Sequence, residues 1–542
     1  MASKIQVKMN AVDKIVSYFS PARGMDRLRL RASYRALDAA GYITPGANRR
    51  SVRAWNPIEG TPDQDTLNKL RASRAGCRDL AMNSPIGRAA LKRELTNVVG
   101  WGLNYQSRID REILGMSNKT ADAWERKTER EFRLWGGTSE CDAARTLNFH
   151  ELQAQALYNT SLSGDVFVLM PYIRRSNQPY QLRIKIVEGD YVCNPNGVPQ
   201  TNKMAGGIEV DSYGAPKKYW FKKIRADQLL NVSSYGLAGS DWVSLNAYGT
   251  KSGRKQVLHL FHQERPGQRR GMPMLAPVVE VLKQITRLSE AELMAAVIAS
   301  FFTVFVKTQP ALGGLTDSIA DSVKVTDESA NDQDANVYEM GNGNIIELGG
   351  EGQDITIADP KRPNEAFAPF FEAMVKQIGS SLEIPYEQLI LHFDASYSAA
   401  RGAMLEAWKF YRHRRIWLSH KFCQPILENW MDEAVIRGRI VAPGYFEDPI
   451  LRQAWLGSFW SGPGQGQIDP LKETQAADLK IQRYLSTYET EYAAIHGDDW
   501  TSGLNRNERE IQMIRDKDLP LPQPNSLVTT AEPAAEEPID KG

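Results

Sequence analysis

The sequence lacks the features that mark several classes of enzyme and membrane protein. No GxxxxGK[ST] phosphate-binding loop occurs among the 542 residues, which excludes a P-loop nucleotide hydrolase and with it a packaging motor. The 4 cysteines are scattered, so neither a disulfide framework nor a zinc site is indicated. The longest apolar run, residues 293–306, is shorter than the roughly 20 residues of a membrane span. These absences predict a chain made in a reducing cytoplasm, with no membrane span and no cofactor.

An excess of charge of either sign is also missing. The chain has 66 Lys and Arg against 65 Asp and Glu, a net charge of +1, whereas a dedicated nucleic-acid binder normally contains a strongly basic domain. Contact with DNA is therefore expected to be local and weak. Residues 23–53 are the exception, because eight Arg against two Asp give +6 there (8 − 2). This arm is either solvated or lies on a partner subunit or on nucleic acid.

The N-terminal residues have the pattern of an amphipathic helix. Val12, Ile15, Val16 and Phe19 follow the spacing i, i+3, i+4 and i+7, and Pro21 ends the pattern. A peripheral docking helix and a removable leader both fit this segment.

Helices are predicted next. Residues 64–100 read as helices broken where Ser84 can cap and Pro85 can occupy the first turn. Another helix is predicted over residues 118–135, ending at Gly136.

The hydrophobic period then changes to that of strands. Alternating or continuous apolar runs are separated by Gly, Pro and Asn, which is typical of a sheet. The expected strands lie within residues 165–173, 180–188, 206–221 and 256–262. A mixed helix and sheet domain is therefore predicted over residues 55–265.

Long helices flank a polar insert in the second half of the chain. One uninterrupted helix is predicted from Pro277 to about Lys307, and another over residues 363–384. Between them, residues 308–362 are polar and rich in Gly and Asp, with a strand pair expected around residues 344–359. A loop over residues 385–396 then leads into a further helix.

That further helix runs from Ser398 towards Gly438, with Ser396 or Ser398 as its cap. A helix is also predicted from Leu471 to about Ile495. The tail from Leu519 is rich in proline and acidic residues, which predicts disorder.

Candidate catalytic groups do not assemble into a site. His259 and His262 lie on a probable strand, where an i, i+3 pair points to opposite faces, so a structural role is favoured over a metal site. The segment SLSGD, residues 161–165, lacks the Gly-x-Ser-x-Gly pattern of a nucleophile elbow. The Gly-rich residues 462–467 are read as a turn. The residues alone therefore favour a structural protein over an enzyme.

Several ordered stretches together resemble the lambda-type portal proteins of tailed bacteriophages. The resemblance covers about residues 20–480 and rests on six segments: GANRRSVRAW (46–55), RDLAMNSPIGRAALKRELTNVVGWGL (78–103), SGDVFVLM (163–170), RPGQRRGMPMLAPVVEVL (265–282), DASYSAARGAMLEAWKFYRHRR (394–415) and GQGQIDPLKETQA (464–476). Six segments in one order are more specific than any single motif.

The resemblance implies an α+β, multi-domain portal fold with wing, stem, clip and crown, forming a ring of about twelve subunits at one capsid vertex in the virion. The expected layout is an N-terminal helix and basic arm (1–54), wing (55–265), outgoing stem helix (266–307), clip (308–362), returning stem helix (363–384), tunnel loop (385–397), wing helix and return (398–470), crown (471–518) and disordered tail (519–542).

Residues near the DNA are proposed from this layout. Lys283 and Arg287 lie one turn apart on the first stem helix, beside Glu280 and Glu290, so one face carries mixed charge. That face borders the channel or a neighbouring subunit, or is simply solvated. In the tunnel loop, the side chains available to touch DNA are Tyr386, Glu387, His392 and Asp394.

The basic and aromatic stretch after the loop has a different expected role. Its basic residues lie deeper in the helix, and Leu405, Trp408 and Tyr411 form a helical apolar stripe that favours packing over base stacking. Contacts between subunits are therefore assigned to Arg401, Lys409, Arg412, Arg414 and Arg415. Direct DNA binding by this cluster stays open as the alternative.

The implied partners follow from the same resemblance. They are the large terminase subunit and a head-completion or adaptor protein at the clip, the major capsid or scaffold protein, and double-stranded DNA that passes without sequence specificity. A nuclease associated with packaging, and a capsid or baseplate component without a DNA path, remain as alternative functions.

Overall fold

The computed structural model describes residues 59–223, 242–300, 304–308, 353–357, 366–392, 396–466, 469–497 and 500–520, together with the single residues 18, 20, 21, 25 and 57. The chain divides into two units, Met1–Asp65 and Thr66–Gly542. The helix expected over residues 12–19 and the basic arm 23–53 lie almost wholly outside the described residues, as does the C-terminal tail from residue 521.

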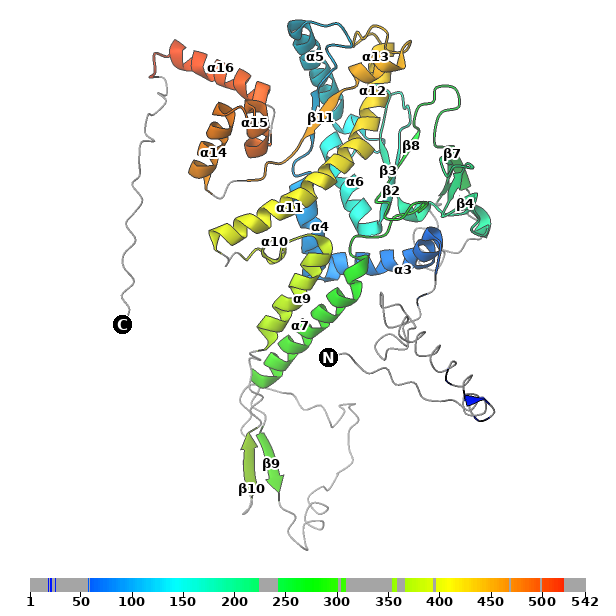
Figure 1. The fold of residues 1–542 in the computed structure, drawn as a ribbon, viewed down its shortest axis with the longest axis vertical. Coiled ribbons are helices and arrows are strands. Elements are labelled where there is room, and N and C mark those ends of the chain that lie inside the picture. Colours follow the sequence, from blue (N-terminus) through cyan, green and yellow to red (C-terminus); the bar gives the residue numbers. More distant parts are fainter. Residues whose placement is uncertain are drawn as a thin grey trace, which may run out of the picture. The chain divides into compact units, whose positions relative to one another are not determined.

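Helices of very different length are found along the chain (Figure 1). The described α-helices are α3 Pro62–Asn83, α4 Pro85–Val98, α5 Asn118–Gly136, α6 Phe149–Ser163, α7 Val279–Ser300, α9 Phe367–Leu382, α10 Tyr386–Ile390, α11 Tyr397–Leu418, α12 Gln424–Ile436, α13 Pro449–Trp455, α14 Pro470–Gln482, α15 Tyr488–His496 and α16 Trp500–Asp516. In the part of the chain that the structure covers, none of these helices is apolar over a length that would cross a bilayer.

The strands form small antiparallel sheets. Their bounds are β1 Asn104–Ser107, β2 Asp165–Leu169, β3 Lys185–Glu188, β4 Met204–Ala205, β5 Ile208–Val210, β6 Pro216–Lys222, β7 Trp242–Asn246, β8 Val257–Phe261, β9 Val304–Thr308, β10 Gln353–Ile357 and β11 Ser458–Ser461. The sheet orders are β3-β2-β8, β4-β5-β6-β7, β1-β11 and β9-β10. In the first of these, β2 is the central strand, and Val166 stands opposite Glu188 on one side and Leu260 on the other.

Local signals account for the elements before residue 170. Ser84 caps α4 by accepting a hydrogen bond from the Gly87 N–H, and Pro85 is the first helical residue. Helix α5 ends at Gly136, one residue beyond the predicted end. Helix α6 starts with a capping box, in which Asn148 and Glu151 exchange side chain to backbone hydrogen bonds. Helices α4 and α5 were predicted from the sequence and are confirmed, whereas α6 was not predicted.

The long helix predicted from Pro277 to Lys307 is wrong at its C-terminal end. Helix α7 ends at Ser300, and residues 304–308 form strand β9. Strand β9 pairs with β10, so that Val306 stands opposite Ile355. Of the strand pair expected within residues 344–359, residues 353–357 form β10, and the rest of that segment lies outside the described residues. The run Val304, Phe305, Val306 favours a strand once a partner strand is available, because β-branched and aromatic residues suit a pleated surface.

Two other predicted helices are interrupted. The helix expected from Ser398 to Gly438 contains a π-helical turn, Ser419–Cys423, between α11 and α12. The helix expected over residues 471–495 breaks after α14, where Tyr484 adopts a left-handed φ of 57°, and Thr487 caps the start of α15. Helix α16 was not predicted.

The main core joins segments that are far apart in the sequence. Phe132 of α5 lies at its centre, with ring centroids 5.1 Å from Tyr105 of β1 and 5.1 Å from Trp430 of α12. Trp460 of β11 pairs with Tyr105 across the β1-β11 ladder. The chain after residue 424 therefore completes a core that begins with α3 and α4.

A smaller core lies between the β3-β2-β8 and β4-β5-β6-β7 sheets. Phe167 of β2 is buried there, and its ring centroid lies 5.5 Å from that of Tyr219 and 5.8 Å from that of Phe221, both on β6. These aromatic contacts hold the second sheet against the first.

His262 follows β8 and is half-buried against α11. Its ring centroid lies 4.1 Å from that of Trp417. Burial, with smaller contributions from Arg414 and His413, lowers the pKa of His262 to about 3. His262 is therefore neutral in the folded protein at pH 5, whereas the unfolded chain binds a proton there, because an ordinary histidine has a pKa of about 6.5. Its stability contribution is present above pH 6.5 and is lost as pH falls towards 3.

We expect His262→Phe to reduce the acid sensitivity of the protein. Between pH 7 and pH 5, the parent loses about 2 kcal/mol of unfolding free energy through this one group, and the variant avoids that loss. Urea unfolding at both pH values measures the difference. His420→Phe, at an exposed position in the π-helical turn, is the matched control and retains the parent's loss. An equal loss in the parent and in His262→Phe would contradict the assignment.

Candidate functional site

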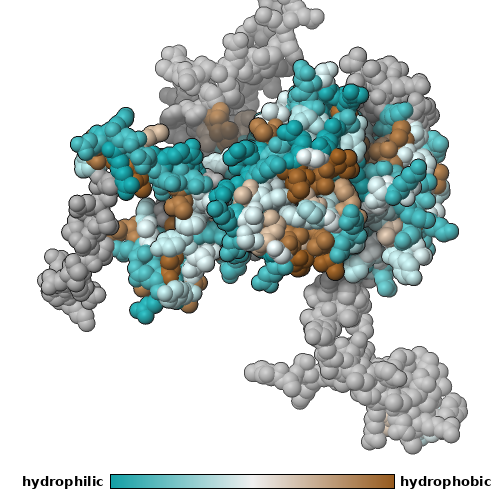
Figure 2. All heavy atoms as spheres, turned by 90° about the horizontal axis from the view of Figure 1, so that it is seen from above, coloured by the Kyte–Doolittle hydropathy of each residue, from teal (hydrophilic) through white to brown (hydrophobic). Residues whose placement is uncertain are grey.

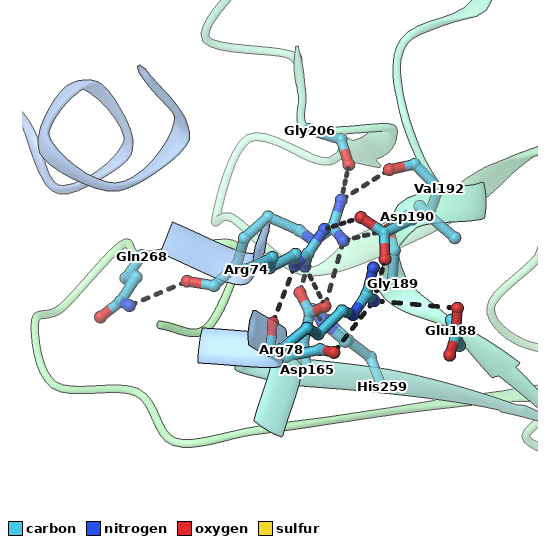
Figure 3. A network of polar contacts seen from close by, with 12 residues as sticks. Arg74, Arg78, Asp165, Glu188, Gly189, Asp190, Val192, Gly206, His259 and Gln268 are labelled. Carbon is cyan, nitrogen blue, oxygen red and sulfur yellow. Dashed lines mark hydrogen bonds and ion pairs between the residues drawn. The ribbon is translucent and has the colours of Figure 1, made fainter. Parts of the chain in front are cut away.

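A buried charge network stands where the sequence motifs SGD (163–165) and QRRG (268–271) meet (Figure 3). Asp165 begins β2 and has a fully buried side chain. Its Oδ1 accepts a hydrogen bond from Arg74 Nη2 of α3 at 2.5 Å, and its Oδ2 accepts one from Arg270 Nε at 2.5 Å. The backbones beside them are equally close, because a Cβ on Gly164 would lie 2.4 Å from the carbonyl oxygen of Gly271. The two motifs therefore interlock.

Arg270 connects this carboxylate to a second part of the domain. Besides its bonds to Asp165, its Nη1 donates to the carbonyl oxygens of Val192 at 2.6 Å and Gly206 at 2.7 Å, and its Nη2 donates to that of Gly189 at 2.6 Å. With Nη2 also 3.1 Å from Asp165 Oδ1, every N–H of the guanidinium has an acceptor. The network thus fixes the turns around residues 189–206 against β2.

His259 of β8 completes the network, with Nε2 lying 3.3 Å from Asp165 Oδ2. Burial would raise the pKa of Asp165, but the charges of Arg270 and Arg74 outweigh it and hold that pKa far below its usual range. Burial lowers the pKa of His259 despite the neighbouring carboxylate. The permanently ionised Asp165, held by two arginines, is suited to cross-linking the fold and not to proton transfer. Within the described ranges no cluster of His, Cys, Asp and Glu could hold a metal ion.

The stem candidates lie on α7 and α9, which run side by side (Figure 1). Where the two helices join the main core, the side chains of Leu282 and Ile285 of α7 and of Ile378 of α9 are buried. Further along, apolar residues are left open, with Leu293 68% exposed and Phe370 53% exposed. The outer parts of these two helices thus present apolar side chains that the described residues of this subunit leave open.

Lys283 and Arg287 are both exposed on α7. Lys283 Nζ lies 3.5 Å from Asp79 Oδ2 of α3, and both side chains remain about half exposed. An exposed pair of this kind contributes little stability, so both cations are available to another molecule.

The predicted tunnel loop is partly helical. Tyr386 and Glu387 start the short helix α10, Leu389 is buried in the main core, and Gln388 Oε1 accepts a 2.7 Å hydrogen bond from the Tyr411 hydroxyl. Leu391 ends the helix with a left-handed φ of 56°.

Tyr386 and His392, two of the proposed DNA-contacting residues, lie at the start of this helix and directly after it. The Tyr386 ring lies 5.5 Å from Lys376 Nζ. His392 is exposed directly after α10, whereas Asp394 lies outside the described residues. The structure thus brings Tyr386, Glu387 and His392 together within one short segment.

Arg415 is engaged inside the subunit. Its guanidinium donates to the carbonyl oxygens of Asn97 at 2.9 Å, Val98 at 3.1 Å and Pro463 at 2.9 Å. It therefore caps the C-terminal end of α4, where a cation is favoured, and ties that end to the segment leading to α14. Burial, with a smaller effect of Arg412, lowers the pKa of Arg415 to about 10, which leaves it charged at neutral pH.

The other members of the basic cluster fall into two groups, one held inside the subunit and one exposed. Arg414 Nε lies 3.2 Å from Oε1 of the buried Glu94. Arg401 pairs with Glu473 of α14 at 2.8 Å, and Lys409 pairs with Glu406 at 2.6 Å on an exposed face. Arg412 is exposed. Lys409 and Arg412 therefore point outward, while Arg414 and Arg415 hold the subunit together.

The apolar stripe predicted on this helix needs a correction. Tyr411 is 1% exposed, as expected for packing, but Leu405 is 46% exposed. The buried face instead contains Ala407, Phe410 and Leu418. The spacing i, i+3, i+4 and i+11 of Ala407, Phe410, Tyr411 and Leu418 was readable in the sequence.

We expect Arg415→Lys to destabilise the subunit by about 1–3 kcal/mol, because one ammonium cannot reproduce the fork that reaches three carbonyl oxygens. Urea unfolding measures this change. Arg412→Lys, on the exposed face of the same helix, is the matched control and changes stability by less than about 0.5 kcal/mol. Equal effects at both positions would show that Arg415 is not an internal clamp.

We expect Asp165→Asn to cost about 3–5 kcal/mol, since it leaves the buried Arg270 without its counter-charge and leaves Arg74 with Asp190, 3.5 Å away. The same unfolding measurement applies. Glu406→Gln removes an exposed ion pair and costs less than about 1 kcal/mol. A stable Asp165→Asn variant would remove the network from its structural role.

Comparisons with known proteins agree on one family. The sequence model of the phage portal proteins of the lambda family matches residues 48–415. The portal protein of Escherichia phage N15 is 26% identical over 491 residues, covering 87% of this chain and 90% of that protein. Portal protein B of Escherichia phage lambda is 24% identical over 503 residues, covering 88% of this chain and 90% of that protein.

Among solved structures, a chain in the neck of an empty gene transfer agent particle has a TM-score of 0.42 and 13% identity, covering 82% of this chain and 96% of that chain. A chain of the native gene transfer agent virion has a TM-score of 0.37 and 15% identity, covering 74% of this chain and 95% of that chain. Because the family model spans more than half of the sequence, over residues 48–415, the chain belongs to the lambda family of phage portal proteins.

Proposed function

We propose that this portal protein forms a closed ring of about twelve copies at one vertex of the phage head, through which double-stranded DNA is packaged and later ejected. Membership of the lambda portal family is the observation that carries the proposal. The net charge of +1 supports it, because each neutralised phosphate adds salt-dependent affinity, and a channel must let DNA slide. The family is structural, so the packaging nuclease considered from the sequence has no support.

The regions of the ring follow the layout expected from the sequence. In this proposal α3 to β8 belong to the wing, α7 and α9 to the stem, the β9-β10 pair to the clip, and α14 to α16 to the crown. The apolar ends of α7 and α9, left open in one subunit, are covered by the same helices of neighbours. Terminase and a head-completion protein bind at the clip, and a capsid or scaffold protein binds the outer surface.

DNA contact is assigned to the segment after α10 and to the exposed face of α7. Exposed His392, next to Glu387 and Tyr386, can touch phosphates without tight binding. Lys283 and Arg287 add cations on α7, with Glu280 and Glu290 exposed on the same helix, so the surface stays mixed in charge. Lys409 and Arg412 are left for contacts between subunits.

We expect replacement of residues 391–395 by Gly and Ser to spare ring assembly and to reduce DNA retention. The replacement leaves the buried Leu389 and the Gln388 to Tyr411 hydrogen bond in place, so α10 stays anchored. The DNA content of particles that carry the variant is the measurement. Replacing the exposed residues 250–252 in the same way is the control. Normal DNA retention would contradict the assignment of this segment to the channel, and loss of the ring would assign it to ring assembly instead.

A further inference from the structure

An apolar groove opens between residues 110–124, which end in the first part of α5, and residues 441–455, which run from the segment after α12 through α13. Its volume is about 510 Å³ and its lining is entirely apolar: Leu114, Met116, Trp124, Val441, Pro443, Gly444, Leu451 and Trp455. We call it the Trp124 groove. Trp124 Nε1 donates to the Val441 carbonyl at 2.8 Å, and Trp455 Nε1 donates to that of Pro443 at 3.1 Å. The indole N–H groups are therefore satisfied within the walls, and the ring faces are left for apolar contact.

Further apolar side chains stand open on the two segments that form the groove. Ile113 is 49% exposed, Val441 64%, Phe446 56% and Ile450 62%. Figure 2, which looks down on the molecule of Figure 1, shows brown apolar surface gathered into patches with hydrophilic residues around them. Scattered apolar residues are normal on a surface, but a gathered set beside a groove marks a binding site.

The same two segments carry an excess of negative charge, with Asp110, Glu112, Asp122, Glu447 and Asp448 against Arg111, Lys119 and Arg452. Asp110, Glu112, Glu447 and Asp448 form no ion pair among the described residues. The arginines of these segments are already paired inside the subunit. Arg111 binds Asp122 at 2.6 Å and Glu125 at 2.8 Å, and Arg452 binds Asp432 at 2.8 Å. The partner that fits is therefore an apolar helix face flanked by basic residues.

We propose that the Trp124 groove takes residues 12–19 of a second copy of this chain. The apolar stripe of Val12, Ile15, Val16 and Phe19 matches the groove, and this stripe is flanked by Lys8, Lys14 and the arm of residues 23–53, in which eight Arg stand against two Asp. Lysine and arginine complement the four carboxylates on the segments that form the groove.

The length of the connecting chain allows this contact between copies. Residues 20–58 precede the continuously described part of the chain and could span up to about 130 Å when extended. A groove on one copy that takes a segment of the next forms a head-to-tail contact, which closes into a ring when the rotation allows it. The inference thus rests on the proposed ring and adds a clasp between neighbouring subunits.

Disulfide trapping tests the clasp in the full chain. Phe19→Cys and Phe446→Cys are combined in a Cys193→Ser background, where the remaining Cys77, Cys141 and Cys423 are buried. We expect mild oxidation to give a ladder of covalent multimers on a non-reducing gel. Pairing Phe19→Cys with Tyr213→Cys, 96% exposed on the turn between β5 and β6, is the control and leaves monomers.

The rate at which the ladder forms tests whether the contact is apolar and charge-dependent. A synthetic peptide of residues 8–22 should compete and slow formation of the ladder, whereas a scrambled peptide should not. Adding Val441→Glu to the trapped pair, which puts a charge at the groove without disturbing a buried residue, should slow the ladder at least severalfold. Glu112→Gln with Glu447→Gln should slow it less and weaken its dependence on salt.

Two results would overturn the clasp. An internal disulfide in monomers alone would show that residues 12–19 dock on their own chain. Absence of cross-linking, or cross-linking that Val441→Glu leaves unchanged, would show that the groove does not take this segment. Electron micrographs of the same samples keep the two proposals apart. Rings without a ladder refute the clasp only, whereas samples without rings refute the proposed function.

Discussion

The buried carboxylate of Asp165 is the constraint on which the arrangement of the sheets and helices depends. It pairs with Arg270 and Arg74, and Arg270 in turn holds the carbonyl oxygens of Gly189, Val192 and Gly206. One charge thereby connects α3, the central strand β2, the turns before β5 and the segment that follows β8. That segment leads through residues 271–278 into α7, the first helix of the proposed stem.

Elements with strong local signals could be predicted from the sequence. The Ser84 cap with Pro85, the stop at Gly136 and the apolar runs of β2 and β8 each depend on residues close in the chain. The pairing of β9 with β10 could not, because 44 residues lie between Thr308 and Gln353 and the apolar run before them also suits a helix. The left-handed turn at Tyr484 could not be predicted either, because no glycine, the residue that usually adopts this conformation, stands there.

In the candidate site, too, features that depend on neighbouring residues could be predicted and those that depend on distant residues could not. That the helix after residue 396 would pack through Tyr411 was predictable, whereas the separate roles of Arg414 and Arg415 on one side and Arg412 on the other were not. Four basic residues in seven look equivalent in the sequence, and only the carbonyl groups of α4 and Pro463 and the buried Glu94 distinguish them. The link between Asp165 and Arg270 is likewise invisible to any local pattern, although both stand beside glycines that come into close approach.

The central claim is that copies of this chain close into a ring around a DNA path bordered by α7 and by the segment after α10. A cryo-electron microscopy reconstruction of the purified protein tests it most directly. The account predicts a cyclic particle with an axial opening wide enough for a DNA duplex, with Lys283, Arg287 and His392 among the residues nearest the axis. A particle without an opening, or one in which the β4-β5-β6-β7 sheet is nearest the axis, would contradict it.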